Sequence, residues 1–583
     1  MPSSPRTPWI TAALLLILSY GTLLRLDAFT GKYGSLDHPA WARLATHQVA
    51  ALARSVRPSA IAWYREPRPY VGGDPINYLN YARQMRSFYQ AHVREPVFLA
   101  ATRLGLWALG GQDPAVSLAS AAGSILAILA TYLLGASLVS PAGGLIAAGL
   151  MAIEYDNVIW AVDGWRDDTF GAAFLFSAWA LVRLCERASF GNALLVGLLG
   201  GAACLTRLTA LSFILPALGW IVLSTRDREH LRAAALAMLI LTAVVSPYLI
   251  SCALAHGDPF YAVNYHTLYY RFAEGMPSQR PMSALGYVRA KLATHPMATL
   301  DGGAVGLLMW PFSQKWHGFD VWIAGLGRVL AWSSLAGMAM WLFSPRGRLM
   351  ILMLVTSMAP FAFTWNVGGG GEWRFSMHVY GVYLIAAVQA WTTLLSPGWR
   401  SAIGRVGLRA AAVGAAAAIA ASLYFALPWF VARESVANGE DTTISAGSRD
   451  RVFYRRGWST PHTDGAITVR VSQAAQTTVH FPLAEKRAYE AVLRLDPVAP
   501  ATQQRVTVLF NRQLIGTLHL SWDPQRVGSY RVPLPIAWVR TGDNEITLVP
   551  DSMVTAEAAG DRFDWIDPDT PIGLRVWYLR VLD

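Results

Sequence analysis

The chain has 583 residues, of which 54% are hydrophobic and only 15% are charged. Soluble domains carry about 25% charged residues, so this composition excludes a soluble enzyme with a simple anchor and predicts a polytopic membrane protein. The net charge of +11 does not require a nucleic-acid partner, because Lys and Arg in loops that hold membrane orientation explain much of it. The three cysteines lie in apolar segments and indicate no disulfide framework or cysteine metal site.

Apolar segments follow one another from Trp9 to Val431. A membrane span needs about 20 apolar residues, which gives about eleven candidates. They are 9–24, 114–138, 141–161, 168–186, 192–206, 208–224, 233–254, 321–343, 348–365, 375–396 and 408–431. The first is interpreted as an uncleaved span, because Arg25 follows it where a cleavage pattern of small residues would stand.

Short connectors rich in Lys and Arg mark the cytoplasmic side of a membrane protein. Such connectors follow the sixth, eighth and tenth candidate spans, which predicts an N-terminus inside and a C-terminus outside. Three large pieces then lie outside the cytoplasm: 25–113, 255–320 and the tail.

After the last span the long apolar runs stop and alternating segments begin. We therefore expect two domains, 1–434 and 435–583. Alternating segments predict strands at Gln476–Phe481, Tyr489–Leu495, Val506–Phe510, Gly516–Leu520, Ile546–Val549 and Leu574–Leu582. Turn residues separate them at Asn511-Arg512 and at Gly542 to Asn544. Short, evenly spaced strands indicate a β-sandwich or jelly roll.

Asp74 stands at a predicted helix start on the outer membrane surface. Asp followed by Pro75 suggests an Asp N-cap with Pro at the first helical position, which sets Tyr78 one turn further on. The carboxylate is either functional or only a cap, and the same Asp-Pro pair recurs at Asp113 and Asp258.

Two further helix starts carry charged residues on the same predicted face. Glu95 precedes Pro96, either as a functional acid or as part of a surface pair with Arg94. Arg166 and Asp167 open the span at 168–186. Acids there complement the helix dipole, whereas an arginine is unfavourable unless it is paired.

Arg207 and Arg374 also fall at outer span ends. Arginine binds phosphate in a fork geometry that lysine cannot match, so a lipid phosphate or pyrophosphate would suit these positions. The alternative is that they pair with Glu372 or Asp167 and hold helices together. Ionisable groups near membrane depth are costly, and each is a functional hypothesis.

Nucleotide and tight metal motifs do not appear. The histidines form no HExxH pattern, and there is neither a Walker A loop nor a GxGxxG after a strand. An enzyme that works outside the cytoplasm, where nucleotide sugars are not supplied, fits this absence.

The order of these features resembles the GT-C superfamily of membrane glycosyltransferases, which includes protein O-mannosyltransferases and the aminoarabinose transferases of lipid A. The resemblance covers about residues 9–431 and rests on Gly73-Asp74-Pro75, Arg94-Glu95-Pro96, Arg166-Asp167, Gly200 to Arg207, and Arg374-Phe375. The chain departs from the family in three ways. A long stretch separates the first span from Asp74, so that Asp27 and Asp37 compete with it; Glu-Pro replaces Pro-Pro; and Asp167 stands where Glu is common.

The resemblance implies an inverting transfer of a sugar from a polyprenyl-phosphate donor to an acceptor hydroxyl on the outer face of the cytoplasmic membrane. It implies Asp74 as general base and Arg207, Arg374 and Arg166 as ligands of the donor phosphate. Glu95, Asp167, Tyr78, Tyr270 and His266 are the expected substrate contacts, the last two from the loop 255–320, which could close over the site. The acceptor is a glycan, lipid or protein. Some members of the superfamily use a divalent metal ion and others do not, and the sequence leaves this open.

The tail resembles the jelly-roll, carbohydrate-binding-type domains attached to some of these enzymes, with a structural lid as the alternative. The rival function is a transporter or flippase of lipid-linked sugars with a glycan-binding tail. Transporters often show internal repeats and charges at the midplane; the absence of a repeat and the gathering of charges at one face favour the enzyme. A third alternative is a glycan-binding or assembly protein, for which a single span would suffice.

Overall fold

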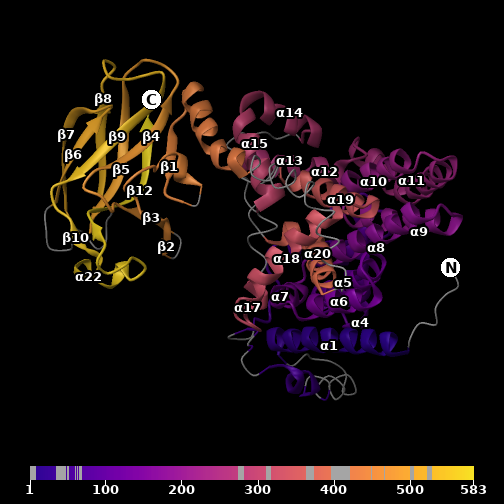
Figure 1. The fold of residues 1–583 in the computed structure, drawn as a ribbon. Helices are drawn as coiled ribbons and strands as arrows, with labels where there is room; N and C mark the ends of the chain where they lie inside the picture. The colour runs from indigo at the N-terminus through magenta and orange to yellow at the C-terminus, as the bar shows by residue number, and fades with distance from the viewer. Residues whose placement is uncertain are drawn as a thin grey trace. The chain divides into compact units, whose positions relative to one another are not determined.

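The computed structural model describes residues 8–34, 48, 51–58, 61, 63–64, 68–273, 281–309, 317–362, 373–395, 421–447, 449–464, 467–498, 504–521 and 528–582. The chain forms two compact units (Figure 1). The helical unit comprises 1–288 and 302–410, and the β unit comprises 289–301 and 411–583. The expected domain boundary at residue 434 stays a prediction.

The helices begin and end near Pro, Ser, Asp and Gly residues, as their capping preferences predict. Ser140 accepts from the backbone N–H of Gly143 at the start of α6, and Ser189 accepts from that of Asn192 at the start of α9. The helices are α1 (Pro8–Tyr33), α3 (Asp74–Gln84), α4 (Pro96–Ala108), α5 (Ala115–Leu138), α6 (Pro141–Ile153), α7 (Tyr155–Asp163), α8 (Asp167–Glu186), α9 (Phe190–Thr206), η1 (Leu208–Ala210), α10 (Leu211–Thr225), α11 (Arg228–His256), α12 (Tyr261–Asn264), α13 (His266–Ala273), α14 (Ala284–Thr294), α15 (Pro296–Ala304), η2 (Val305–Met309), α17 (His317–Asp320), α18 (Leu326–Trp341), α19 (Pro345–Ala362), η3 (Trp373–Val379) and α20 (Tyr380–Leu394).

Several of these helices are long and apolar enough to cross a membrane. Within the described residues there are five, namely α1, α5, α8, the η1–α10 segment and α11. The pair α6 and α7, bent by 58°, would make a sixth if it is one span. The helical membrane class is confirmed, and the count of about eleven stays a prediction. The first span is longer than expected, because α1 continues from the predicted end at residue 24 to Tyr33.

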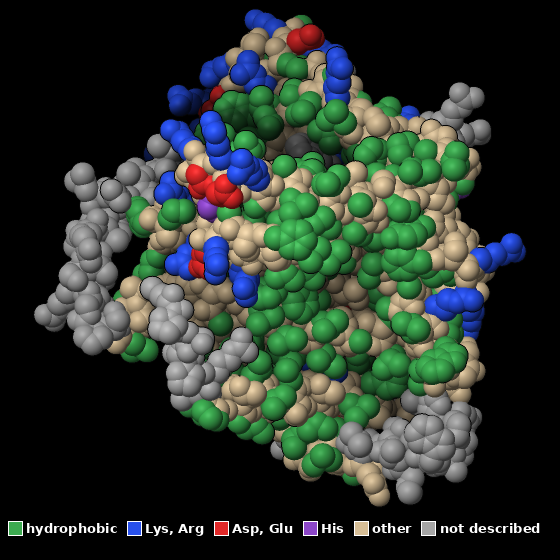
Figure 2. All heavy atoms as spheres, turned by 90° about the vertical axis from the view of Figure 1, so that its right-hand side faces the viewer, with side chains coloured by type: hydrophobic (Ala, Val, Ile, Leu, Met, Phe, Trp, Pro, Cys, Tyr) green, Lys and Arg blue, Asp and Glu red, His purple; other side chains and the backbone are tan. Residues whose placement is uncertain are grey.

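Small residues let the central helices approach closely. A Cβ on Gly144 of α6 would lie 2.7 Å from the backbone N of Ala136 in α5. Bulky apolar side chains remain on the outside, among them Leu223, Leu239 and Leu254 of α10 and α11. Figure 2 shows a face of the molecule with hydrophobic side chains over its middle and charged ones gathered toward the upper left and the right edge. An apolar area of this kind suits contact with lipid.

The β unit contains two antiparallel sheets. One has the order β2-β3-β12-β5-β8 with β1 also paired to β12, and the other has the order β4-β9-β6-β7. The strands are β1 (Thr442–Ser445), β2 (His462–Asp464), β3 (Ile467–Val471), β4 (Thr477–Leu483), β5 (Tyr489–Pro497), β6 (Gln504–Phe510), β7 (Gln513–Leu520), β8 (Gly528–Leu534), β9 (Gly542–Pro550), β10 (Val554–Thr555), β11 (Pro571–Ile572) and β12 (Leu574–Leu582). A helix over 421–437 precedes β1, and α22 (Ala556–Ala559) follows β10.

All six strands expected from the sequence are present, and inward-facing residues of both sheets share one core, including Phe481, Leu493, Phe510 and Val576. Asn511 and Arg512 form the β6–β7 turn with φ angles of 49° and 72°, the left-handed pair that a two-residue hairpin needs. The segment expected as a turn at Gly542 to Asn544 instead begins β9, because those residues pair with β4.

Candidate active site

Asp74 is the first residue of α3, so the predicted helix start is confirmed and the predicted cap is wrong. The N-cap is Gly73, whose φ of 66° is in the left-handed region, and Asp74 makes no cap. Its carboxylate instead accepts from the Tyr78 hydroxyl at 3.5 Å and lies 3.8 Å from Nη2 of Arg94. Burial raises the pKa of Tyr78, which keeps this phenol protonated.

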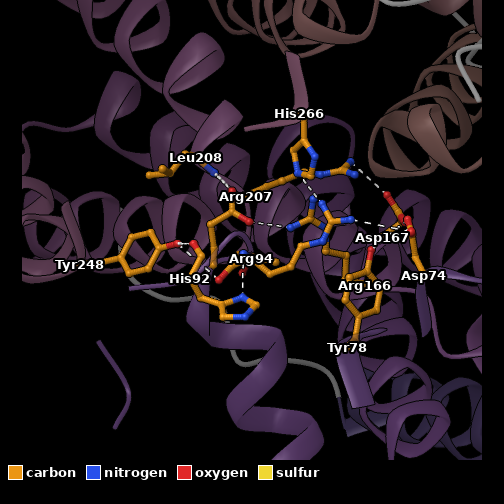
Figure 3. A network of polar contacts seen from close by, with 12 residues as sticks. Asp74, Tyr78, His92, Arg94, Arg166, Asp167, Arg207, Leu208, Tyr248 and His266 are labelled. Atoms are coloured by element: carbon orange, nitrogen blue, oxygen red, sulfur yellow. Dashed lines mark hydrogen bonds and ion pairs between the residues drawn. The ribbon is translucent and has the colours of Figure 1, made fainter. Parts of the chain in front are cut away.

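Glu95 is buried and both of its carboxylate oxygens are engaged. One accepts from Nη1 of Arg166 at 2.5 Å, and the other accepts from the backbone N–H of Leu208 at 2.8 Å. Arg166 therefore has the partner that its helix-start position demanded. Through Glu95, the start of α4 fixes the start of α8 and the turn between α9 and η1. Figure 3 shows Arg166, Arg207 and Leu208 within this network.

Arg207 occupies that turn with an extended backbone, which turns its side chain toward the start of α8. Its Nη1 lies 3.0 Å from Oδ1 of Asp167. Three aromatic rings surround the guanidinium: Phe170, Phe361 and Phe375 have centroids 5.6, 5.0 and 5.7 Å from it. Such cation–π contacts help to hold an arginine charge away from water.

Arg94 and His266 close the network from the other side. Arg94 donates to Nε2 of His266, because a guanidinium can only donate. Burial, followed by the nearby Arg94, Arg166 and Arg207, lowers the pKa of His266 well below its usual value. The imidazole is therefore neutral. The hydroxyl of Tyr248 in α11 holds this segment by donating to the backbone carbonyl of His92 at 2.8 Å.

The network has three arginines, Arg94, Arg166 and Arg207, against three carboxylates, Asp74, Glu95 and Asp167. The carboxylates differ in access: the side chain of Asp74 is 33% exposed, whereas those of Glu95 and Asp167 are 4% and 2% exposed. Among the described residues, Nε of Arg94 and Nε of Arg166 are buried and find no hydrogen-bond partner. A ligand or ordered water can satisfy buried donors of this kind.

The other predicted site residues lie as follows. Asp27 is buried in α1, where it accepts from the indole of Trp63 at 2.8 Å and pairs with Arg57. Tyr270 packs against Tyr269 and Tyr287. Arg374 is in η3, and its neighbour Phe375 reaches Arg207. The side chain of Arg374, together with Asp37 and Glu372, lies outside the described residues.

Arg94 and Tyr248 were missed as site residues. Arg94 adjoins Glu95 at the same helix start, so its position was a usable signal, whereas Tyr248 looks like any tyrosine inside an apolar span. In the described part of the chain, no group of three or more His, Cys, Asp or Glu side chains is arranged to hold a metal ion.

Sequence comparison bears on this same region. Residues 93–250 match the family model of dolichyl-phosphate-mannose-protein mannosyltransferases. The match confirms the resemblance to membrane glycosyltransferases. It spans the segment that carries Arg94, Glu95, Arg166, Asp167 and Arg207, and it ends after Tyr248. No curated protein matches the chain significantly.

Several solved structures are distantly similar. The oligosaccharyltransferase AglB from Archaeoglobus fulgidus, in complex with an inhibitory peptide and a dolichol-phosphate, matches with 14% identity and a TM-score of 0.42 over 73% of this chain and 56% of its own. The chain thus spans a little over half the length of AglB. ArnT from Cupriavidus metallidurans bound to undecaprenyl phosphate matches with 14% identity and a TM-score of 0.39, over 69% of this chain and 72% of its own. A family 35 carbohydrate binding module from an environmental isolate matches with 17% identity and a TM-score of 0.16, over 22% of this chain and 91% of its own.

Proposed function

We propose that the chain is an integral membrane glycosyltransferase that transfers a sugar from a polyprenyl-phosphate donor to an acceptor hydroxyl, with inversion at the anomeric carbon. The family match over 93–250 supports the reaction class. The observation that carries the mechanism is the difference in access within the network. The Asp74 side chain is 33% exposed, whereas those of Glu95 and Asp167, which also pair with arginines, are buried.

Asp74 is the general base in this proposal. As the acceptor oxygen attacks the anomeric carbon, its proton passes to the Asp74 carboxylate and the bond between that carbon and the lipid phosphate oxygen breaks. The lipid phosphate leaves with the electron pair. Tyr78 and Arg94, which contact the carboxylate, keep it oriented.

The arginines stabilise the charge that develops on the leaving phosphate. Arg207 is positioned by Asp167 and three aromatic rings, and Arg166 by Glu95. The unpartnered Nε atoms of Arg94 and Arg166 supply further donors for an anion, so Arg94 joins the expected Arg207, Arg166 and Arg374. Preorganised charge of this kind is usually the largest single contribution to catalysis. Glu95 acts on substrate indirectly, by holding Arg166.

We also propose that Tyr270 and the neutral His266, both from the outer loop 255–320, contact the substrate. We also propose that the protein lies in the cytoplasmic membrane, with the network at its outer face and the β unit outside the cytoplasm. The β unit is either a carbohydrate-binding domain or a structural lid. Metal dependence is left to experiment.

The test is turnover by purified full-length protein with a panel of polyprenyl-phosphate sugars and membrane extract as acceptor source. We expect Asp74→Asn to lower turnover by about 10²–10⁴, the usual contribution of a general base, with an unchanged unfolding temperature. The matched control is Asp113→Asn, which changes another Asp-Pro pair whose side chain is exposed and pairs with Arg83.

Retained turnover in a folded Asp74→Asn protein would contradict the base assignment and move it to Asp37 or another acid. Absence of turnover by the wild type with every donor would contradict the transferase and favour the transporter.

A further inference from the structure

A cavity lies beside the chain segments that carry Asp74 and Arg166, with Gly72 and Trp165 among its lining residues. Its volume is about 450 Å³, and it is lined mainly by Lys32, Trp63, Tyr64, Tyr70, Asp163 and Trp165. This volume is within the range of small-ligand sites. None of the lining residues belongs to the arginine–carboxylate network, so the cavity is a separate site.

The polar side of the cavity is built around Asp163 at the end of α7. Its Oδ1 accepts from Nζ of Lys32 at 2.7 Å and from the Tyr64 hydroxyl at 3.0 Å. Its Oδ2 accepts no hydrogen bond from the described residues, and the side chain is 32% exposed. One carboxylate oxygen is thus fixed in place and the other is available to a donor such as a hydroxyl.

The aromatic side of the cavity is rigid. Trp63 is anchored by its N–H bond to Asp27 and stacks on Tyr155, with ring centroids 5.3 Å apart. Trp165 lies against Trp160 at 5.3 Å. Tyr70, by contrast, is 65% exposed and forms part of the rim.

The cavity reaches the chain segment of the proposed base. Gly72 lines it, two residues before Asp74, and a Cβ on Gly73 would lie 3.5 Å from the Trp165 ring. Trp165 itself precedes Arg166, which pairs with Glu95. The segments 72–74 and 165–167 therefore present one set of side chains to the network and another to the cavity.

We propose that this cavity binds a carbohydrate acceptor; the proposal rests on the proposed function and names its acceptor class. Aromatic faces pack against the C–H face of a sugar ring, while the free oxygen of Asp163 and the cations Lys32 and Arg68 bond its hydroxyls. An acyl chain would leave the charged groups of Lys32 and Asp163 beside hydrocarbon without gain. An extended peptide would instead favour a sheet edge.

The test is isothermal titration calorimetry. Neutral trisaccharides of glucose, galactose and mannose are titrated into detergent-solubilised full-length protein. We expect saturable binding of at least one of them and a weakening of at least about fivefold in Tyr70→Ala, as the loss of one aromatic contact predicts. Tyr70→Phe keeps the ring and should bind like the wild type. The control is Phe88→Ala, which removes a 40% exposed ring that does not line the cavity.

Donor turnover measured on the same preparations separates the two proposals. If wild-type protein releases sugar from the donor but binds none of the trisaccharides, or if Tyr70→Ala binds them as the wild type does, the cavity proposal is overturned and the transferase stands. If the trisaccharides bind in a manner that depends on Tyr70 but no donor is turned over, the proposed function fails, and the cavity remains a carbohydrate site without a reaction.

Discussion

At the residue scale, the network is arranged so that each cation has its own acid. Glu95 pairs with Arg166 and Asp167 with Arg207, and both pairs are buried. Removing one partner of a buried pair leaves an uncompensated charge, which is strongly destabilising. These two acids therefore hold the arginines in position, and the more exposed Asp74 is left for chemistry.

His266 gives the network a measurable pH dependence. Its pKa is lowered well below 6.5 in the folded state, first by burial and then by Arg94. In the unfolded protein the imidazole has a pKa of about 6.5. Below that pH the unfolded state therefore binds more protons than the folded state. Stability that is present above the unfolded pKa should then be lost as the pH falls toward the folded pKa.

We expect the unfolding temperature of the wild type in detergent to fall more steeply than that of His266→Gln between about pH 6.5 and 5. Above that range the two proteins should respond to pH alike. Parallel curves throughout would mean that His266 is already solvated or charged in the folded protein.

At the element scale, glycines bring α5 and α8 together and thereby place the start of α8. A Cβ on Gly123 would lie 2.8 Å from the backbone N of Thr169, two residues after Asp167. Movement of a side chain cannot relieve this contact, because the obstructing atoms include backbone atoms of Thr169. The position of Asp167 thus depends on a glycine in a neighbouring helix.

Gly123→Ala should destabilise the protein by about 1–3 kcal/mol, the usual cost of overpacking, and should also lower turnover by displacing Asp167. Thermal unfolding and turnover are measured together. Gly219→Ala in α10 is the matched control, since no atom lies within 4 Å of its added Cβ. If the two variants behave alike, the close contact between α5 and α8 does not determine the geometry of the network.

The sequence predicted elements better than it predicted contacts between them. Strands β4, β5, β6, β7, β9 and β12 follow from alternation, and the turn at Asn511-Arg512 follows from its residues, because both are local properties. Strand β8 was not predicted. The bond from Glu95 to the backbone N–H of Leu208 joins residues far apart in the chain, and no local pattern encodes it. The segments expected as spans at 192–206 and 208–224 are helical, and only the second is long enough to cross a membrane. The turn between them matters most, since it directs Arg207 at Asp167.

At the scale of the whole molecule, the helical unit combines an apolar exterior with the buried arginine–carboxylate network. Hydrophobic side chains face outward over the middle of the surface seen in Figure 2, while the ion pairs Glu95–Arg166 and Asp167–Arg207 are buried. Charges at membrane depth are costly and are kept only where they pair or act on a ligand. We therefore expect chemistry on a lipid-linked, anionic substrate at this network.

Chemistry and transport differ in what happens to the bond between sugar and lipid phosphate. The most direct measurement uses proteoliposomes that contain a polyprenyl-phosphate radiolabelled in its sugar, with wild-type protein beside Asp74→Asn. We expect the label to leave the lipid and become attached to acceptor with the wild type, and to stay on the lipid with Asp74→Asn. Label that crosses the bilayer while still attached to its lipid, at equal rates in both proteins, would overturn the proposed transferase and identify a transporter.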